Sequence, residues 1–161
     1  MFKPIAFVLL AVATLLNSST APAYAQQPCE LRGQTLQLTG NTNQYSALPN
    51  IPISVYRSGG YVKSGASDNN GEINLPIPPG SPVYIVFVAP NGFLPELQSL
   101  AAGQAMKHTI HVSLLTVTQA KALKIDPYKH TKAIIDQLEA QGVSEKDEGL
   151  IQLKKLLRDL G

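Results

Sequence analysis

Short segments of alternating hydrophobicity, separated by glycine, proline, asparagine and serine, fill the chain from 29 to 115. Side chains that alternate with a period of two bury one face of a strand, and turn signals at close intervals favour an antiparallel sandwich or barrel. The predicted strands are 34–40, 50–58, 61–67, 71–77, 83–89, 93–99 and 107–115. We therefore expect a mainly β fold, a seven-stranded antiparallel sandwich.

Two of these segments also indicate where their strands lie in a sheet. The segment "VYIVFVA" at 83–89 is apolar on both faces, which predicts a central strand that is covered on both sides. The segment "FLPELQS" at 93–99 contains Pro95, which has no backbone N–H to donate to a neighbouring strand. It is therefore expected at the edge of a sheet.

The hydrophobic period becomes helical after Thr116. Asp126 followed by Pro127 is typical of a helix start, and Gly142 supplies a stop. Ser144, with Asp147 three residues later, predicts the start of a second helix through a weak capping box. We expect three parts: a signal peptide at 1–25, the β-sandwich at 29–115, and a C-terminal α-helical hairpin at 116–161.

Both predicted helices carry an apolar stripe, which has two interpretations. In the first, which we favour, the stripes pack on each other or on the sheet. In the second they form a docking surface for a partner protein. The residues of that candidate surface are Tyr128, Ile135, Leu138, Leu150, Leu153 and Leu157.

The segment "ASDNNGEINLPIPPG" at 66–80 resembles part of a calcium-binding loop. Such a loop needs a glycine at its sixth position and a glutamate at its twelfth. Counted from Asp68, the glycine comes fourth, as Gly71, and the twelfth residue is Pro79. A tight turn explains the segment better, because Asp68 can accept backbone N–H groups and Gly71 tolerates positive φ. We expect this turn to close a hairpin.

Three motifs together resemble carboxypeptidase regulatory-like domains, which belong to the transthyretin-like (prealbumin-like, Ig-like) sandwiches. They are "SDNNGEI" at 67–73, "PGSPVYI" at 79–85 and "NGF" at 91–93, and the resemblance covers about 31–115. It implies a non-catalytic module that acts outside the cytoplasm. One transthyretin-like branch hydrolyses a purine-derived ring and ends in Tyr-Arg-Gly-Ser, whereas this chain ends "RDLG".

The N-terminus has the features of an export signal. Lys3 precedes the apolar run "IAFVLLAVATLL", and Ala23-Tyr24-Ala25 fits a cleavage site. The run is too short for a spanning helix, so we expect no membrane span after cleavage and a periplasmic or extracellular location. Cys29 is the single cysteine, so no internal disulfide can form.

Charge and histidine placement exclude several function classes. Without Lys3, twelve Lys and Arg are interspersed with eleven Asp and Glu, so no basic surface for nucleic acid is expected. His108 and His111 are three residues apart in a strand and point to opposite faces, and His130 is expected in solvent. We expect no metal, no cofactor and no catalytic residue.

The leading functional hypothesis is an exported, non-catalytic binding or assembly module with a protein partner in the cell envelope. The alternative is a module that binds carbohydrate or another small ligand through two polar loops, and a hydrolase of unrecognised type is the third. The candidate ligand residues of those loops are Asn43, Tyr45, Asn91 and Phe93.

Overall fold

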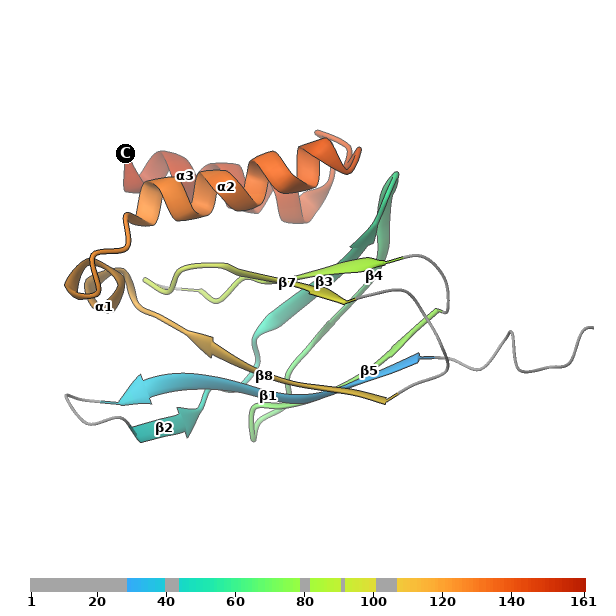
Figure 1. Ribbon diagram of the computed structural model, residues 1–161, viewed down its shortest axis with the longest axis horizontal. Coiled ribbons are helices and arrows are strands. Elements are labelled where there is room, and N and C mark those ends of the chain that lie inside the picture. The colour runs from blue at the N-terminus through green and yellow to red at the C-terminus, as the bar shows by residue number, and fades with distance from the viewer. Residues whose placement is uncertain (1–28, 40–43, 79–81, 91, 101–106) are drawn as a thin grey trace, which may run out of the picture.

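Two β-sheets and a layer of helices make up the structure (Figure 1). The computed structural model describes residues 29–39, 44–78, 82–90, 92–100 and 107–161, so the expected signal peptide lies outside the described residues. The strands are β1 (Cys29–Thr39), β2 (Gln44–Ala47), β3 (Pro52–Arg57), β4 (Gly60–Ala66), β5 (Glu72–Ile77), β6 (Val83–Phe87), β7 (Glu96–Leu100) and β8 (Lys107–Leu114). The helices are α1 (Val117–Ala122), α2 (Pro127–Ala140) and α3 (Glu148–Leu160). Within the described part of the chain, no helix is long and apolar enough to cross a membrane.

The first sheet is built around β1. One edge of β1 pairs with β8 in parallel. Its other edge pairs antiparallel with β5 along its first half and with β2 along its second half. The second sheet is antiparallel throughout, in the order β4-β3-β6-β7.

The mainly β fold class is confirmed, with two refinements. The structure has an eighth strand, β2, where a loop was predicted, and the pair β1–β8 is parallel. Alternation tells which side chains face the core, but it does not fix strand direction. The β1–β8 contact also needs a glycine, because a Cβ at Gly33 would lie 1.6 Å from the carbonyl oxygen of Ile110.

Inward side chains of both sheets form the main core. β6 lies between β3 and β7, and four of its five residues are buried, as its two apolar faces predict. β7 is an edge strand that begins directly after Pro95, also as predicted. The buried members of this core are Leu31, Leu48, Ile51, Ile53, Val55, Ile73, Leu75, Ile77, Val83, Ile85, Phe87, Ala89, Val112 and Leu114.

The turn between β4 and β5 forms as predicted, but it does not close a hairpin. Asp68 Oδ1 accepts the backbone N–H groups of Asn70 and Glu72, at 2.8 and 2.9 Å, and Gly71 has φ +73°. β4 belongs to the second sheet and β5 to the first, so the turn carries the chain between sheets. The hairpin prediction was wrong because β1 holds the turn, with Thr35 donating its backbone N–H to the Gly71 carbonyl.

The C-terminal segment forms three helices. Asp126 caps α2 by accepting the N–H of Lys129, Pro127 is its first residue, and Gly142 follows with φ +81°, all as predicted. The prediction that α3 starts at Ser144 was wrong. Asp147 is the N-cap, because its Oδ1 accepts the Leu150 N–H, while the Ser144 hydroxyl accepts the Lys146 N–H within the preceding turn. Helix α1 was not predicted.

Helices α2 and α3, called the helical hairpin below, lie on the outer face of the second sheet (Figure 1). The favoured interpretation of the apolar stripes is therefore the one that the structure shows. The buried residues of this second core are Tyr56, Val86, Ile134, Ile135, Leu138, Val143, Leu150 and Leu153. Four of the six residues of the candidate docking surface are among them, so they offer no exposed surface to a partner in this arrangement.

Candidate functional site

A groove of about 590 Å³ lies where the start of α3 meets the outer face of β3 and β4. We call it the Tyr61 groove. One wall is the β3–β4 pair, and the other is the first turn of α3 with the residue before it. The lining residues are Pro52, Ile53, Ser54, Tyr56, Tyr61, Ser64, Gly65, Lys146, Asp147, Glu148, Gly149 and Gln152.

The floor of the Tyr61 groove is a contact between sheet and helix. Tyr56 is 1% exposed, and its hydroxyl donates to Asp147 Oδ1 at 2.7 Å. Burial raises the pKa of Tyr56 above the usual tyrosine range, and the hydrogen bond to Asp147 raises this pKa further. The same carboxylate oxygen accepts the Leu150 N–H at 3.0 Å. Asp147 therefore caps α3 and ties it to β3.

Gly149 makes this approach possible. A Cβ at this position would lie 2.3 Å from the Tyr56 hydroxyl oxygen. That separation is far shorter than a van der Waals contact of about 3.5 Å. The glycine thus sets how closely the first turn of α3 approaches the sheet.

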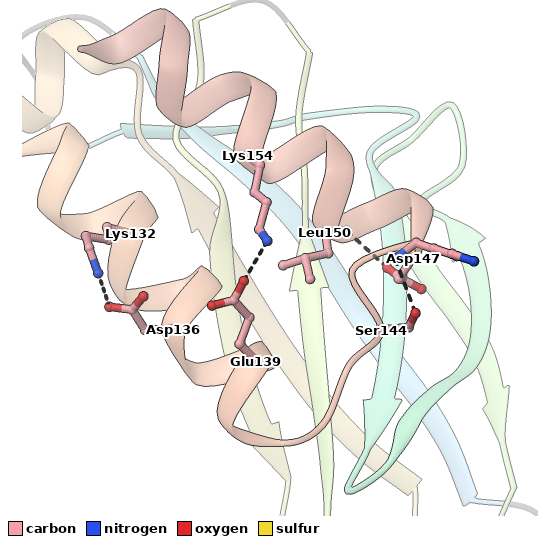
Figure 2. A network of polar contacts seen from close by, with 8 residues as sticks. Lys132, Asp136, Glu139, Ser144, Asp147, Leu150 and Lys154 are labelled. Atoms are coloured by element: carbon pink, nitrogen blue, oxygen red, sulfur yellow. Dashed lines mark hydrogen bonds and ion pairs between the residues drawn. The ribbon is translucent and has the colours of Figure 1, made fainter.

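Figure 2 shows the neighbouring contacts within the helical hairpin. Lys154 of α3 bonds Glu139 of α2 at 2.6 Å, and this hydrogen bond raises the pKa of the lysine. Leu150 extends from α3 toward α2 beside this ion pair and is fully buried. Partly exposed ion pairs contribute little to stability, so apolar burial is the main force that holds the hairpin together.

Tyr61 presents an open aromatic surface at the groove. The residue is 56% exposed, and its hydroxyl donates to Ser64 Oγ at 3.0 Å. Its ring meets that of Tyr56 edge-on, with centroids 6.3 Å apart and planes at 73°. Two contacts thus hold an exposed ring in one orientation, which is the arrangement that a stacking ligand needs.

Polar groups of both signs surround this ring. Lys146, Glu148 and Gln152 are exposed on the α3 side, and Ser54 and Ser64 lie on the sheet side. The first two backbone N–H groups of α3 have no hydrogen-bond partner among the described residues, as is usual at a helix start. The groove can therefore both donate and accept hydrogen bonds.

Two smaller hollows lie elsewhere. One of about 480 Å³ is on the outer face of the first sheet, where Arg32, Asp68, Glu72 and His111 are among its lining residues. The other, of about 250 Å³, lies between β7 and α2 beside Glu96 and His130. The Tyr61 groove is the largest of these three hollows, and an aromatic side chain stands exposed in its lining.

His130 was predicted to be solvated, and this was wrong. The side chain is half-buried, with Nε2 2.9 Å from the Pro95 carbonyl oxygen and 3.7 Å from Glu96 Oε2. Burial raises the pKa of Glu96, and the nearby His130 opposes that rise. In sequence, His130 lies between Lys129 and Lys132, which suggested an exposed helix face and did not reveal that α2 lies against β7.

The other two histidines lie on β8. His111 is exposed and His108 is half-buried, on opposite faces of the strand as predicted. Among the described residues, no three His, Cys, Asp or Glu side chains are grouped as a metal site would require.

The four candidate ligand residues are not shown as one site. Tyr45 lies on β2 and is 57% exposed. Phe93 packs partly buried against the main core and forms an isolated bridge with Thr116. Asn43 and Asn91 lie outside the described residues. Sequence reasoning also missed Tyr61, because only the packing of α3 on the sheet turns its position into a groove.

No family model matches the chain, and a search of curated proteins finds no match. Several solved structures are similar. A minor pilin of Streptococcus agalactiae is 12% identical with a TM-score of 0.48, over 58% of this chain and 46% of the pilin. The TIE protein of Bacillus anthracis is 22% identical with a TM-score of 0.42, over 55% of this chain and 18% of that one. The 5-hydroxyisourate hydrolase of Klebsiella pneumoniae is 14% identical with a TM-score of 0.38, over 54% of this chain and 88% of the hydrolase.

The match thus spans less than half the length of the first two of these proteins. At such identities and scores, none of the likenesses supports an argument about function. The two-sheet architecture is established by the strand pairing itself. The resemblance to carboxypeptidase regulatory-like domains remains a prediction.

Proposed function

We propose that this protein is an exported, non-catalytic binding module whose binding site is the Tyr61 groove. The observation that carries the proposal is the exposed Tyr61 ring, held in a fixed orientation by Ser64 and Tyr56 at the mouth of a hollow of about 590 Å³. Ligand pockets in proteins are about 300–1,000 Å³ and combine aromatic surface with a few placed polar groups.

The chemistry of the lining favours binding over hydrolysis. Its described residues include Ser54 and Ser64 but neither histidine nor cysteine. Ser64 accepts the Tyr61 hydroxyl, and Asp147 is engaged by the Tyr56 hydroxyl and by the Leu150 N–H. Neither serine has a histidine beside it in this set, so the Ser–His pairing that activates a nucleophile for acyl transfer is not present in the lining.

The export part of the proposal rests on the sequence. The positively charged start, the apolar run and the Ala-Tyr-Ala site at 23–25 together support secretion, and a protein that is secreted this way acts in the cell envelope or outside it.

A direct test maps where ligands contact the mature chain, 26–161. Amide chemical shifts of isotope-labelled protein are followed during titration with sugars, nucleosides, amino acids and short peptides at millimolar concentration. The proposal expects the perturbed amides to gather at Tyr61, Ser64 and Gln152, and each ligand to be recovered chemically unchanged. Perturbation confined to other faces, or turnover of a ligand, would contradict it.

A protein partner in the envelope is the second candidate function, supported by exposed apolar side chains on the helical segment. Leu123, Tyr128 and Ile151 are all more than two fifths exposed. Tyr128 belongs to the originally expected contact set, and Leu157 of that set is half-buried. If these side chains make the contact, Tyr128→Ser with Ile151→Ser abolishes partner binding and leaves ligand binding at the groove unchanged.

A further inference from the structure

Resting on the proposed function, we infer that the ligand of the Tyr61 groove is an uncharged sugar ring, stacked on Tyr61, within a neutral oligosaccharide. Three observations select this class: the orientation of the Tyr61 ring, the charge balance of the groove, and the protected edge of β4.

The Tyr61 ring is suited to the apolar face of a pyranose. Its hydroxyl is already used by Ser64, so the exposed part of the residue presents mainly aromatic carbon. A ring that is fixed before binding loses little conformational entropy when a ligand stacks on it.

The charges around the groove cancel, which argues against an ionic ligand. Lys146 supplies one positive charge, and the start of α3 adds the partial positive charge of a helix N-terminus. Asp147 and Glu148, at the same helix end, offset both. An anion would meet two carboxylates, and a cation would meet a lysine and a helix N-terminus. Neutral hydroxyl groups, which both donate and accept, match Gln152 and the two serines without this cost.

An extended peptide is disfavoured by the strand that borders the groove. A peptide that binds by adding a strand would pair with the free edge of β4, since β4 is the outer strand of the second sheet. The pairing register of β3 with β4 shifts between Val55 and Tyr56, and Lys63 lies opposite the buried Val55. Irregular pairing and a lysine on the edge strand are features that protect such strands against pairing with another chain.

The test compares the two most exposed tyrosines of the described chain. Tyr61 and Tyr45 are 56% and 57% exposed, so Tyr45→Ala is a matched control for Tyr61→Ala. The probes are neutral cello-, malto- and chito-oligosaccharides, a sulfated oligosaccharide as the anionic control, and an unstructured peptide. Binding is measured by amide shifts and by calorimetry on the mature chain.

We expect at least one neutral oligosaccharide to bind at the groove. Tyr61→Ala should weaken this binding by about tenfold, the loss typical of removing an aromatic stacking partner. Tyr61→Phe should keep most of the affinity, since it keeps the ring, and Tyr45→Ala should change nothing. If Tyr61→Ala does not fold by circular dichroism, Gln152→Ala replaces it, with a smaller expected loss from the polar rim.

The outcomes separate this inference from the proposed function. Binding of the sulfated probe or the peptide alone, at the groove, overturns the sugar assignment and leaves the groove as a binding site. Neutral sugars that bind equally well to Tyr61→Ala and to the parent overturn the stacking geometry. If no probe of this set perturbs the groove at millimolar concentration, the sugar inference fails. The proposed function fails with it if the nucleosides and amino acids of the first titration also leave the groove unperturbed.

Discussion

The close approach of Gly149 in α3 to Tyr56 in β3 predicts the sign of a stability change. Replacing a helical glycine by alanine usually stabilises a protein, by about 1 kcal/mol in a helix interior. At Gly149 the new Cβ would lie 2.3 Å from the Tyr56 hydroxyl oxygen, about 1 Å inside contact distance. Either the first turn of α3 moves away or the hydroxyl moves, and both break the Tyr56–Asp147 hydrogen bond.

The magnitude follows from that bond. A hydrogen bond to a charged acceptor contributes about 1.5–3 kcal/mol, and Asp147 is only half-buried, so the lower end applies. After the gain in helix propensity, which is reduced in a first turn, Gly149→Ala should destabilise the protein by about 1 kcal/mol. Tyr56→Phe removes the same bond and should cost about 1.5–2 kcal/mol.

The two substitutions should not add. Without the Tyr56 hydroxyl there is little for the alanine Cβ to displace, so the double variant should be about as stable as Tyr56→Phe alone. The coupling free energy is then about 1 kcal/mol, equal to the cost of Gly149→Ala alone and above the few tenths that unconnected sites show.

Urea unfolding followed by far-ultraviolet circular dichroism measures the stability of the parent, the two single variants and the double variant. Tyr45→Phe, an exposed tyrosine on β2, controls for removal of a hydroxyl and should shift stability by less than about 0.5 kcal/mol. A Gly149→Ala variant that is more stable than its parent while Tyr56 is intact would refute the reasoning, because it would mean that α3 does not approach the sheet as described.

Three further predictions concern the same interface. Leu138 is fully buried, so Leu138→Ala should lower the free energy of unfolding by about 2–5 kcal/mol. Amide hydrogen exchange should become faster in α2 and α3 more than in β8, and unchanged exchange in the helices would contradict their packing on the sheet. The Thr131 hydroxyl is buried without a hydrogen-bond partner among the described residues, so Thr131→Val should raise the free energy of unfolding by about 1 kcal/mol, and a loss of stability would count against this. Burial raises the pKa of Tyr56, so the folded state keeps the phenol proton while the tyrosine of the unfolded chain ionises near pH 10. The free energy of unfolding should therefore be unaffected by this group below pH 10 and should fall above it. Between neutral pH and about 11, the Tyr56→Phe variant should lose less of its free energy of unfolding than the parent.

The strands were predictable because local alternation reports burial directly. Ile53 and Val55 of β3 face the main core, and Ile73 and Leu75 of β5 do the same in the other sheet. The assignment of strands to sheets was not predictable in this way. The turn at 68–71 has identical local chemistry whether it closes a hairpin or crosses between sheets, and the choice is made by its contact with Thr35, far away in sequence.

The candidate site was harder to predict than the fold, for a related reason. Its members come from 52–65 and 146–152, and nothing in either segment identifies the other. From its own segment, Tyr61 is simply a tyrosine after a Gly-Gly turn. Tyr45 on β2 is exposed to almost the same degree and does not line this groove. What distinguishes Tyr61 is the neighbouring Tyr56, which the helix start holds in place through Asp147.

One clue to this arrangement was nevertheless present in the sequence. The segment at 83–89 is apolar on both faces, so something had to cover the outer face of its sheet. The only long apolar stripes left unpaired by the sandwich were those after 126. In the structure, the outward-facing Val86 packs in one core with Ile135 and Leu150 of the helical hairpin. The hairpin is thus required to bury the second sheet and, in the same contact, supplies one wall of the Tyr61 groove. A substitution that loosens α3 should therefore weaken ligand binding as well as stability.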